Sequence, residues 1–328
     1  ANELNFDTNI RKAIAFNISG PICLAIASIY CYNNSVTFNF LNKLFVYIGM
    51  PIISMTTYLF LYTPSVKDVI TGTQSNFETS GGFGPNQVST ILGLGIFIFF
   101  VQLMLNSSNG ILQIITGGLV LFFVYIGLIT FSRGGIYTGV AMILLLLAIL
   151  YFQANFQTKP KIAGIIVLSF LATLAVWSYS SIKTNGLLDK RYANQDAAGR
   201  EKKSQLSGRE ILIESELKMF YENPILGVGV GKNKELRKSQ TGIDLATHNE
   251  ITRMLAEHGT LGIVGLLILV ITPLYLFAVD RQNILALSFF VFWLLTINHA
   301  AMRLSAPAFI YALSLLKVYR EAPAVHRK

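Results

Sequence analysis

The chain has 328 residues, of which 53% are hydrophobic and 13% charged, and its formal net charge is +9. A soluble domain carries about a quarter charged residues, so lipid is the natural solvent for this much Leu, Ile and Phe. The composition excludes a disordered chain, a collagen-like chain and a nucleic-acid-binding module. We therefore interpret the excess of basic residues first as a signal of membrane topology.

Nine apolar segments are long enough to span a membrane, since a spanning helix needs roughly 20 mainly apolar residues. They lie at about residues 12–31, 40–62, 86–105, 111–131, 135–152, 161–180, 260–279, 283–301 and 304–319. Backbone groups inside lipid must hydrogen-bond internally, and the runs lack the alternation of β-barrel strands, so helices are predicted. The predicted fold class is all-α: a polytopic transmembrane bundle of about nine spans, the last two alternatively forming one broken helix.

Three regions follow from this pattern. Residues 1–180 are expected to form the N-terminal part of the bundle, with six spans and a polar outward loop at 63–85. Residues 181–259 are the one long hydrophilic segment and are expected to carry short helices. Residues 260–328 return to the membrane and end in a cytoplasmic tail. Because the chain begins with Ala, we interpret it as a fragment or a processed chain.

The positive-inside rule orients the bundle. Lys159, Lys161, Arg281 and the basic C-terminal tail fall on one side, which the rule places in the cytoplasm. The 181–259 segment then faces outward. Arg133 and Arg303 break the rule, because each lies at the outer end of an apolar span. A cation in such a place is stabilised by a nearby anion, or it snorkels to a phospholipid headgroup.

Two helix starts are predicted in the outward segment, at the capping boxes Ser207–Glu210 and Thr247–Glu250. A helix start presents free N–H groups and a partial positive charge, so it favours anions. Arg209, expected at the second helical position, is unfavourable for helix stability because its charge opposes this dipole. A doubly charged anion bound there would offset this cost. His248, expected at the first position, is favoured in its neutral form, which accepts a proton from a hydroxyl. Two ordinary capped helices with exposed Arg and His remain the alternative.

Several chemistries are disfavoured by missing motifs. The sequence has no H-E-x-x-H, no paired-Asp metal signature, no P-loop and no G-x-S-x-G. The two cysteines, Cys23 and Cys31, lie in an apolar stretch and indicate neither a disulfide framework nor a zinc site. We therefore expect no metal and no cofactor. The residues alone predict an outward site of arginines and one histidine, suited to a lipid-linked phosphate ester and a hydroxyl acceptor.

Four motifs, in this order, carry a family resemblance. They are G-G-F-G-P-N-Q at 81–87, S-R-G-G at 132–135, G-R-E at 208–210 followed by F-Y-E-N-P-I-L-G-V-G at 220–229, and T-H-N-E at 247–250 leading to L-A-E-H-G-T-L-G at 255–262. With the long outward loop between the sixth and seventh spans, the chain resembles the O-antigen ligase and polymerase (Wzy-C-type) family over about residues 81–303. Family members usually carry around a dozen spans, so the resemblance implies that the first few are missing here.

The resemblance implies an inverting, metal-independent glycosyl transfer at the periplasmic face of the bacterial inner membrane. The implied donor is a glycan on undecaprenyl diphosphate. The implied acceptor is a lipid A-core sugar (ligase), a second lipid-linked glycan (polymerase) or a protein (O-oligosaccharyltransferase). The family's roles map onto Arg133 and Arg209, which would hold the diphosphate, and onto His248, which would act as general base. Arg303 is added as a further diphosphate-binding candidate. Three residues are candidates for a supporting role: Asn86, Asn249 and Glu250.

The competing class is a polysaccharide transporter or flippase. Such a protein would distribute charges through the interior of several spans, whereas the spans here are nearly free of Asp and Glu. If the protein were an inert membrane scaffold, the positions of Arg133 and Arg303 against the positive-inside rule would have no explanation. The expected partners are therefore the lipid-linked glycan, the acceptor glycan and membrane lipid, and no nucleic acid.

Overall fold

The computed structural model describes residues 10–64, 69, 72–106, 109–202, 209–243, 245, 247–299 and 305–319. The chain is helical apart from one small parallel sheet, in which β1 (Ser35–Thr37) pairs with β2 (Lys317–Tyr319). The helices are α1 (Ile10–Cys31), α2 (Phe38–Tyr62), α4 (Pro85–Leu105), α5 (Gly110–Ile129), α6 (Arg133–Gln153), α7 (Lys159–Lys183), α8 (Leu187–Tyr192), α9 (Glu210–Glu222), α10 (Lys232–Thr241), α11 (Glu250–Val279), α12 (Ala286–Ile297) and α13 (Ser305–Leu313), with a 3-10 turn at Glu78–Ser80.

Six of the described helices are long and apolar enough to cross a membrane. They are α2, α4 together with the turn before it, α5, α6, α7 and α11. The predicted all-α, multi-pass membrane fold is therefore confirmed.

The expected count of nine spans is not confirmed, because three of the apolar segments form shorter helices. The apolar part of α1 is Asn17–Cys31. With 12 and 9 residues, α12 and α13 extend about 18 and 14 Å, well short of the roughly 30 Å of a bilayer core. The last segment ends its helix at Leu313 and continues into β2, whose Val318 pairs with Val36 of β1.

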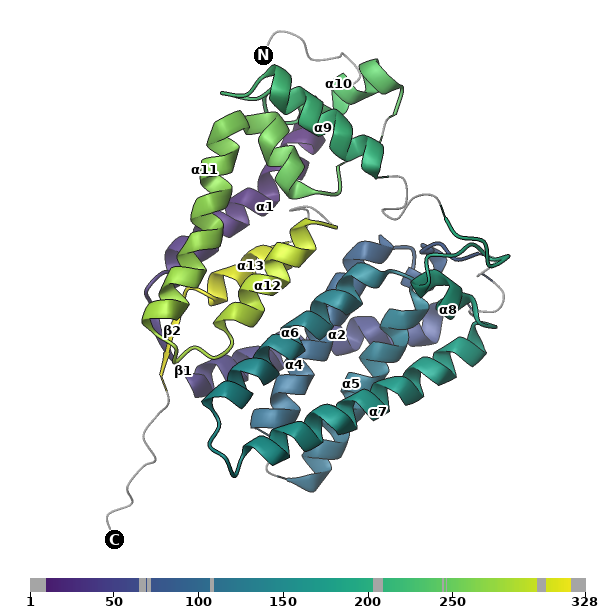
Figure 1. The fold of residues 1–328 in the computed structure, drawn as a ribbon, viewed down its shortest axis with the longest axis vertical. Helices are drawn as coiled ribbons and strands as arrows, with labels where there is room; N and C mark the ends of the chain where they lie inside the picture. Colours follow the sequence, from purple (N-terminus) through teal and green to yellow (C-terminus); the bar gives the residue numbers. More distant parts are fainter. Residues whose placement is uncertain are drawn as a thin grey trace.

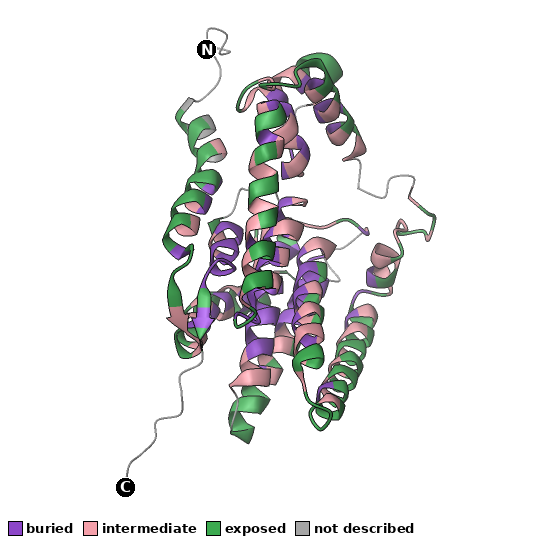
Figure 2. Cartoon of the chain, turned by 60° about the vertical axis from the view of Figure 1, so that its left-hand side comes forward, coloured by how far each residue is buried: buried purple, intermediate pink, exposed green. Residues whose placement is uncertain are grey.

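The helices form two groups that meet along α12 (Figure 1). One group contains α2 and α4 to α7, and the other contains α1 and α11 to α13, with α12 packed against both α6 and α13. At the centre of the first group, α4 is buried on most of its surface. In contrast, α7 and the apolar half of α11 remain largely exposed (Figure 2). Exposed apolar helices of this length are expected to face lipid.

The described helices alternate in direction, so chain segments that are distant in sequence meet at one end of the bundle. The starts of α4, α6 and α11 lie at the same end as the C-termini of α5, α7 and α12, and α8 and α9 lie there too (Figure 1). The opposite end carries the short connections with Lys159, Lys161 and Arg281, together with Lys317 of β2. These basic residues therefore lie at the end of the bundle opposite the long hydrophilic segment.

Close contact between α4 and α6 fixes the start of α6. A Cβ on Gly135 would lie 1.9 Å from the carbonyl oxygen of Ser89, and a Cβ on Gly93 would lie 2.1 Å from that of Gly135. Ser89 reinforces this contact, since its hydroxyl lies 2.9 Å from that of Ser132 and accepts from the Gly135 N–H at 3.3 Å. The glycines after Arg133 therefore allow the two backbones to touch.

Gly135→Ala should destabilise the protein, because its new methyl group meets backbone rather than a side chain that can move. Overpacking typically costs about 1–3 kcal/mol, and a rigid neighbour favours the upper end. The matched control is Gly164→Ala on α7, where a Cβ meets nothing within 4 Å. Thermal unfolding in detergent should give a lower midpoint for Gly135→Ala and an unchanged or higher one for Gly164→Ala. Equal midpoints would contradict the packing account.

Candidate active site

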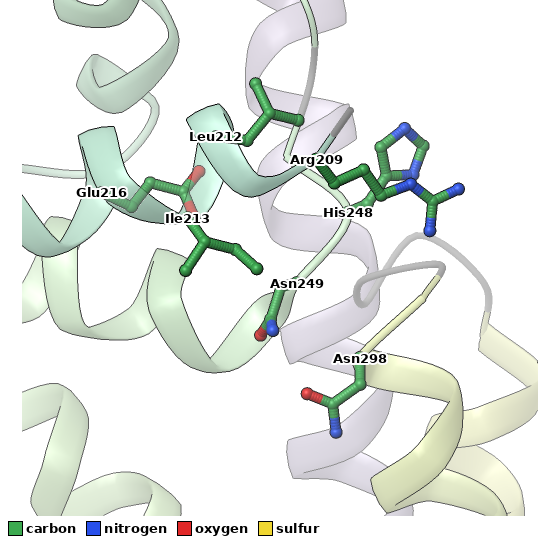
Figure 3. A pocket seen from close by; sticks show the side chains of 7 residues that line it. All are labelled: Arg209, Leu212, Ile213, Glu216, His248, Asn249 and Asn298. Carbon is green, nitrogen blue, oxygen red and sulfur yellow. The ribbon is translucent and has the colours of Figure 1, made fainter. Parts of the chain in front are cut away.

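A pocket of about 210 Å³ opens at the end of the bundle where α9, the segment before α11 and the turn after α12 meet (Figure 3). The side chains of Arg209 and His248 lie next to each other on one side of it (Figure 3). The other lining residues are Leu212, Ile213, Glu216, Asn249 and Asn298. The pocket therefore combines a cation, an imidazole, a carboxylate, two amides and two aliphatic side chains.

The two helix starts differ from the predicted capping boxes. Arg209 is the N-cap of α9 rather than its second residue, and its side chain makes no capping hydrogen bond; residues 203–208, with the predicted cap Ser207, lie outside the described residues. In α11 the cap is Asn249 rather than Thr247, and its side chain accepts from the N–H groups of Ile251 and Thr252. His248 therefore precedes the helix instead of starting it, and Asn249 holds the turn that presents it.

A buried carboxylate joins the three helices around the pocket. Glu216 of α9 and Arg237 of α10 are both 0% exposed and form an ion pair at 2.9 Å. Glu216 also accepts from the hydroxyls of Thr247 and Thr252, the latter at 2.6 Å, and Asn233 donates to the Thr247 hydroxyl at 3.1 Å. Because Thr247 and Thr252 flank the His248 turn, this network fixes the turn relative to α9.

The first turns of α11 contain a second ion-pair group. Arg253 pairs with Glu250 and, at 3.4 Å, with Glu257, and it donates to Asn17 of α1 at 3.2 Å. The N–H of Gly231 donates to Glu257 at 3.0 Å. Glu250, one of the predicted supporting residues, is fully buried and does not line the pocket. Glu250 pairs with Arg253 of the same helix, and Arg253 in turn donates to Asn17 of α1.

Glycines bring the segment after α9 onto a kink in α11. Gly259 has φ 58°, which places a kink within α11. The Thr260 N–H donates to the Pro224 carbonyl at 2.8 Å, and the Val228 N–H donates to the Ala256 carbonyl at 2.8 Å. A Cβ on Gly227 would lie 2.4 Å from the Glu257 backbone. The glycine run 227–231 therefore docks against α11 and is not placed at the pocket.

Arg133 and Arg209 belong to one electropositive region. Arg133, the first residue of α6, donates from Nη1 to the carbonyl of Arg191 at 3.3 Å. Burial, and then the nearby Arg133 and Arg209 guanidinium groups, lower the pKa of Arg191 to about 10. Burial also lowers the pKa of Arg209 itself. Both shifts reflect the cost of holding a cation out of water, and the shift of Arg191 also reflects repulsion by the other two guanidinium groups.

The remaining candidates have separate places. Asn86, the second residue of α4, accepts from the Ser132 hydroxyl at 2.9 Å and donates to the His299 carbonyl at 3.2 Å. It therefore links the residue before Arg133 to the turn that contributes Asn298 to the pocket. Arg303 lies outside the described residues. Within the described residues, no group of three His, Cys, Asp or Glu side chains is placed to hold a metal ion.

Sequence reasoning missed Glu216, Arg237, Arg191 and Asn298. The buried residues of α9 are Leu212, Ser215, Glu216 and Met219. A Glu in the middle of an apolar helix face was the signal available for Glu216, since a buried carboxylate requires a partner. The pattern named no partner, because Arg237 comes from a helix with few apolar residues.

A comparison with family models identifies residues 118–270 as an O-antigen ligase (Wzy_C) segment. The chain is therefore similar to this family over just under half of its length. The match runs from α5 into α11 and contains Arg133, Arg209 and His248, whereas the Gly81–Gln87 motif precedes it. No curated protein matches the chain. The family match supports a function of the O-antigen ligase and polymerase type in general, and the apolar helices point to a multi-pass membrane protein. Lipid-linked glycans are the general substrate class of this family.

Arg237→Met should strongly destabilise the protein, because it leaves the Glu216 carboxylate buried without its cation. Breaking a buried ion pair typically costs about 3–5 kcal/mol. Lys218→Met is the control, since the Lys218 and Glu222 side chains are 64% and 51% exposed and 3.8 Å apart. Such a surface pair contributes about 0–1 kcal/mol. Thermal midpoints in detergent that fall equally for the two variants would contradict the assigned importance of Glu216.

Proposed function

We propose that the protein transfers a glycan from undecaprenyl diphosphate to a sugar hydroxyl at the periplasmic face of the inner membrane, with inversion and without a metal. The observation that carries this proposal is the pocket lined by both Arg209 and His248, next to the cluster of Arg133 and Arg191. A phosphate-binding cation and a proton acceptor side by side are the two groups that this transfer requires.

His248 is the proposed general base. It removes the proton of the acceptor hydroxyl as the acceptor oxygen bonds to the anomeric carbon, while the bond from that carbon to the diphosphate oxygen breaks. The electron pair of the broken bond leaves with the diphosphate. Asn249 and the Glu216 network hold the His248 turn in place, so the base is preorganised rather than carried on a free loop.

Arg133 and Arg209 are proposed to bind the diphosphate. Its negative charge increases as the sugar bond breaks, so fixed guanidinium groups stabilise the transition state more than the ground state. Arginine suits this role because it binds phosphate in a bidentate manner and stays charged. The lipid tail would leave the site between helices, since α7 and α11 present apolar surface along their length.

The distribution of charges favours a transferase over a flippase. The cations of the site lie at the start of α6, at the end of α8 and at the N-cap of α9, whereas a flippase requires polar groups along a path through the bundle. Among acceptors, a lipid A-core sugar (ligase) and a second lipid-linked glycan (polymerase) are the leading pair, with a protein acceptor as the alternative. The acceptor is expected to be selected by the segments around the pocket.

His248→Ala should abolish transfer while donor binding survives, because the base acts on the acceptor. A general base contributes about 10²–10⁴-fold to the rate. Reconstituted transfer from a glycan on undecaprenyl diphosphate measures this loss. The control is His258→Ala, ten residues further along and outside the pocket lining, which should keep transfer near the parent rate. A purified His248→Ala protein with parental transfer would remove the base assignment.

Arg209→Ala should weaken donor binding as well as transfer, because its guanidinium holds the leaving group. Arg281→Ala, an exposed residue after α11 at the opposite end of the bundle, is the matched control. Donor Kd should rise at least tenfold for Arg209→Ala and stay unchanged for Arg281→Ala.

Reconstituted transfer with lipid A-core, lipid-linked and peptide acceptors separates the three acceptor classes, whereas glycan translocation without transfer would support the flippase.

A further inference from the structure

Arg191 is a cation that neither the motifs nor the pocket lining singles out. It lies on α8, a short helix between the end of α7 and the segment that leads to α9. Its Nε donates to the Phe131 carbonyl at 2.9 Å, and its own carbonyl accepts from Arg133 Nη1 at 3.3 Å. The two arginines are thus linked at the start of α6.

Aromatic packing holds α8 rigidly at this position. The ring of Tyr192 lies 4.6 Å from that of Trp177 on α7 and 5.7 Å from that of Tyr137 on α6, measured between centroids. Trp177 also donates to Asp189 at 2.7 Å. Arg191 is therefore presented by a helix that is fixed to two spanning helices, which lowers the entropy lost when a ligand binds.

The carboxylates nearest to Arg191 in sequence are engaged elsewhere. Asp189 accepts from Trp177 and Ser181, and Asp196 pairs with Arg200 at 2.8 Å. Within the described part of the chain, no carboxylate forms an ion pair with Arg133, Arg191 or Arg209; the ion pairs there involve the cations of Arg200, Lys218, Arg237 and Arg253. Among the residues that the structure describes, the three arginines of this region therefore have no carboxylate as an ion-pair partner.

Repulsion within the region shows how close these cations are. The low pKa of Arg191 reflects burial first and then Arg133, with Arg209 contributing as well. Burial, followed by Arg191 and Arg133, also lowers the pKa of Lys202. Cations brought together out of water raise the free energy of the empty site, and a polyvalent anion that binds among them removes this repulsion.

We propose that Arg191 binds the donor diphosphate directly, together with Arg133 and Arg209. This inference rests on the proposed function and adds a residue to its diphosphate site. Since Nε bonds to Phe131, the two Nη groups of Arg191 remain for phosphoryl oxygens, the arrangement in which arginine binds phosphate most tightly.

Binding of inorganic pyrophosphate to the full-length chain in detergent tests this directly. Arg191→Gln should raise the Kd for pyrophosphate at least tenfold. Arg200→Gln, from the same outward segment and with an 81% exposed side chain, is the matched control and should leave the Kd unchanged. A Kd for folded Arg191→Gln within twofold of the parent would overturn the inference.

A second measurement needs no variant and covers the case in which Arg191→Gln does not fold. Phenylglyoxal modifies accessible arginines, and mass spectrometry reports the extent at each residue. Pyrophosphate should protect Arg191 but not Arg200, and unchanged modification of Arg191 would overturn the inference. Arg133→Gln and Arg209→Gln separate the two claims: if only these variants lose pyrophosphate binding, Arg191 is not a ligand. If neither loses it, the proposed diphosphate site itself fails.

Discussion

The burial of one carboxylate organises the end of the bundle where the candidate site lies. Glu216 can be withdrawn from water only because Arg237 and the hydroxyls of Thr247 and Thr252 surround it. Those partners come from α10 and from both sides of the His248 turn. Satisfying Glu216 therefore brings Arg209, at the start of the same helix, and His248 to one pocket.

A second constraint is the close packing of α4 against α6. The glycines of α4 and α6 let the two backbones touch, so Arg133 begins its helix at the side of α4. The tie from Arg133 to the Arg191 carbonyl then connects α6 to α8. The start of α6, helix α8 and the start of α9 therefore bring three arginines into one region. No described carboxylate forms an ion pair with Arg133, Arg191 or Arg209, and this arrangement favours the binding of an anion with more than one charge.

Parts of this arrangement could be predicted from the sequence because they depend on local patterns. The lengths of the apolar segments predict the helical membrane fold. Arg133 can be identified as a candidate site residue from the sequence alone, because it breaks the positive-inside rule. The motifs around Arg133, Arg209 and His248 indicated the family that the comparison with residues 118–270 confirms. These signals are carried by consecutive residues or by composition, so they can be recognised without knowing the tertiary contacts.

The rest depends on contacts between distant segments. Thr247 satisfies the usual pattern of a helix cap, but Glu216 takes its hydroxyl and Asn249 becomes the cap instead. The sequences of α12 and α13 are apolar and therefore predict spanning helices. In the structure these helices are too short to span a membrane, and they pack against α6 and α1. Arg191 carries no motif, and its neighbours Arg133 and Arg209 are 58 and 18 positions away.

The central claim is that Arg133, Arg191 and Arg209 bind one diphosphate, and that His248 lies beside it. The most direct test is an experimental structure of the protein with an undecaprenyl-diphosphate glycan bound. The account predicts diphosphate oxygens within hydrogen-bonding distance of Arg133 and Arg209, with the anomeric carbon facing the His248 side of the pocket. A donor whose diphosphate binds away from these arginines, or whose sugar lies out of reach of His248, would contradict it.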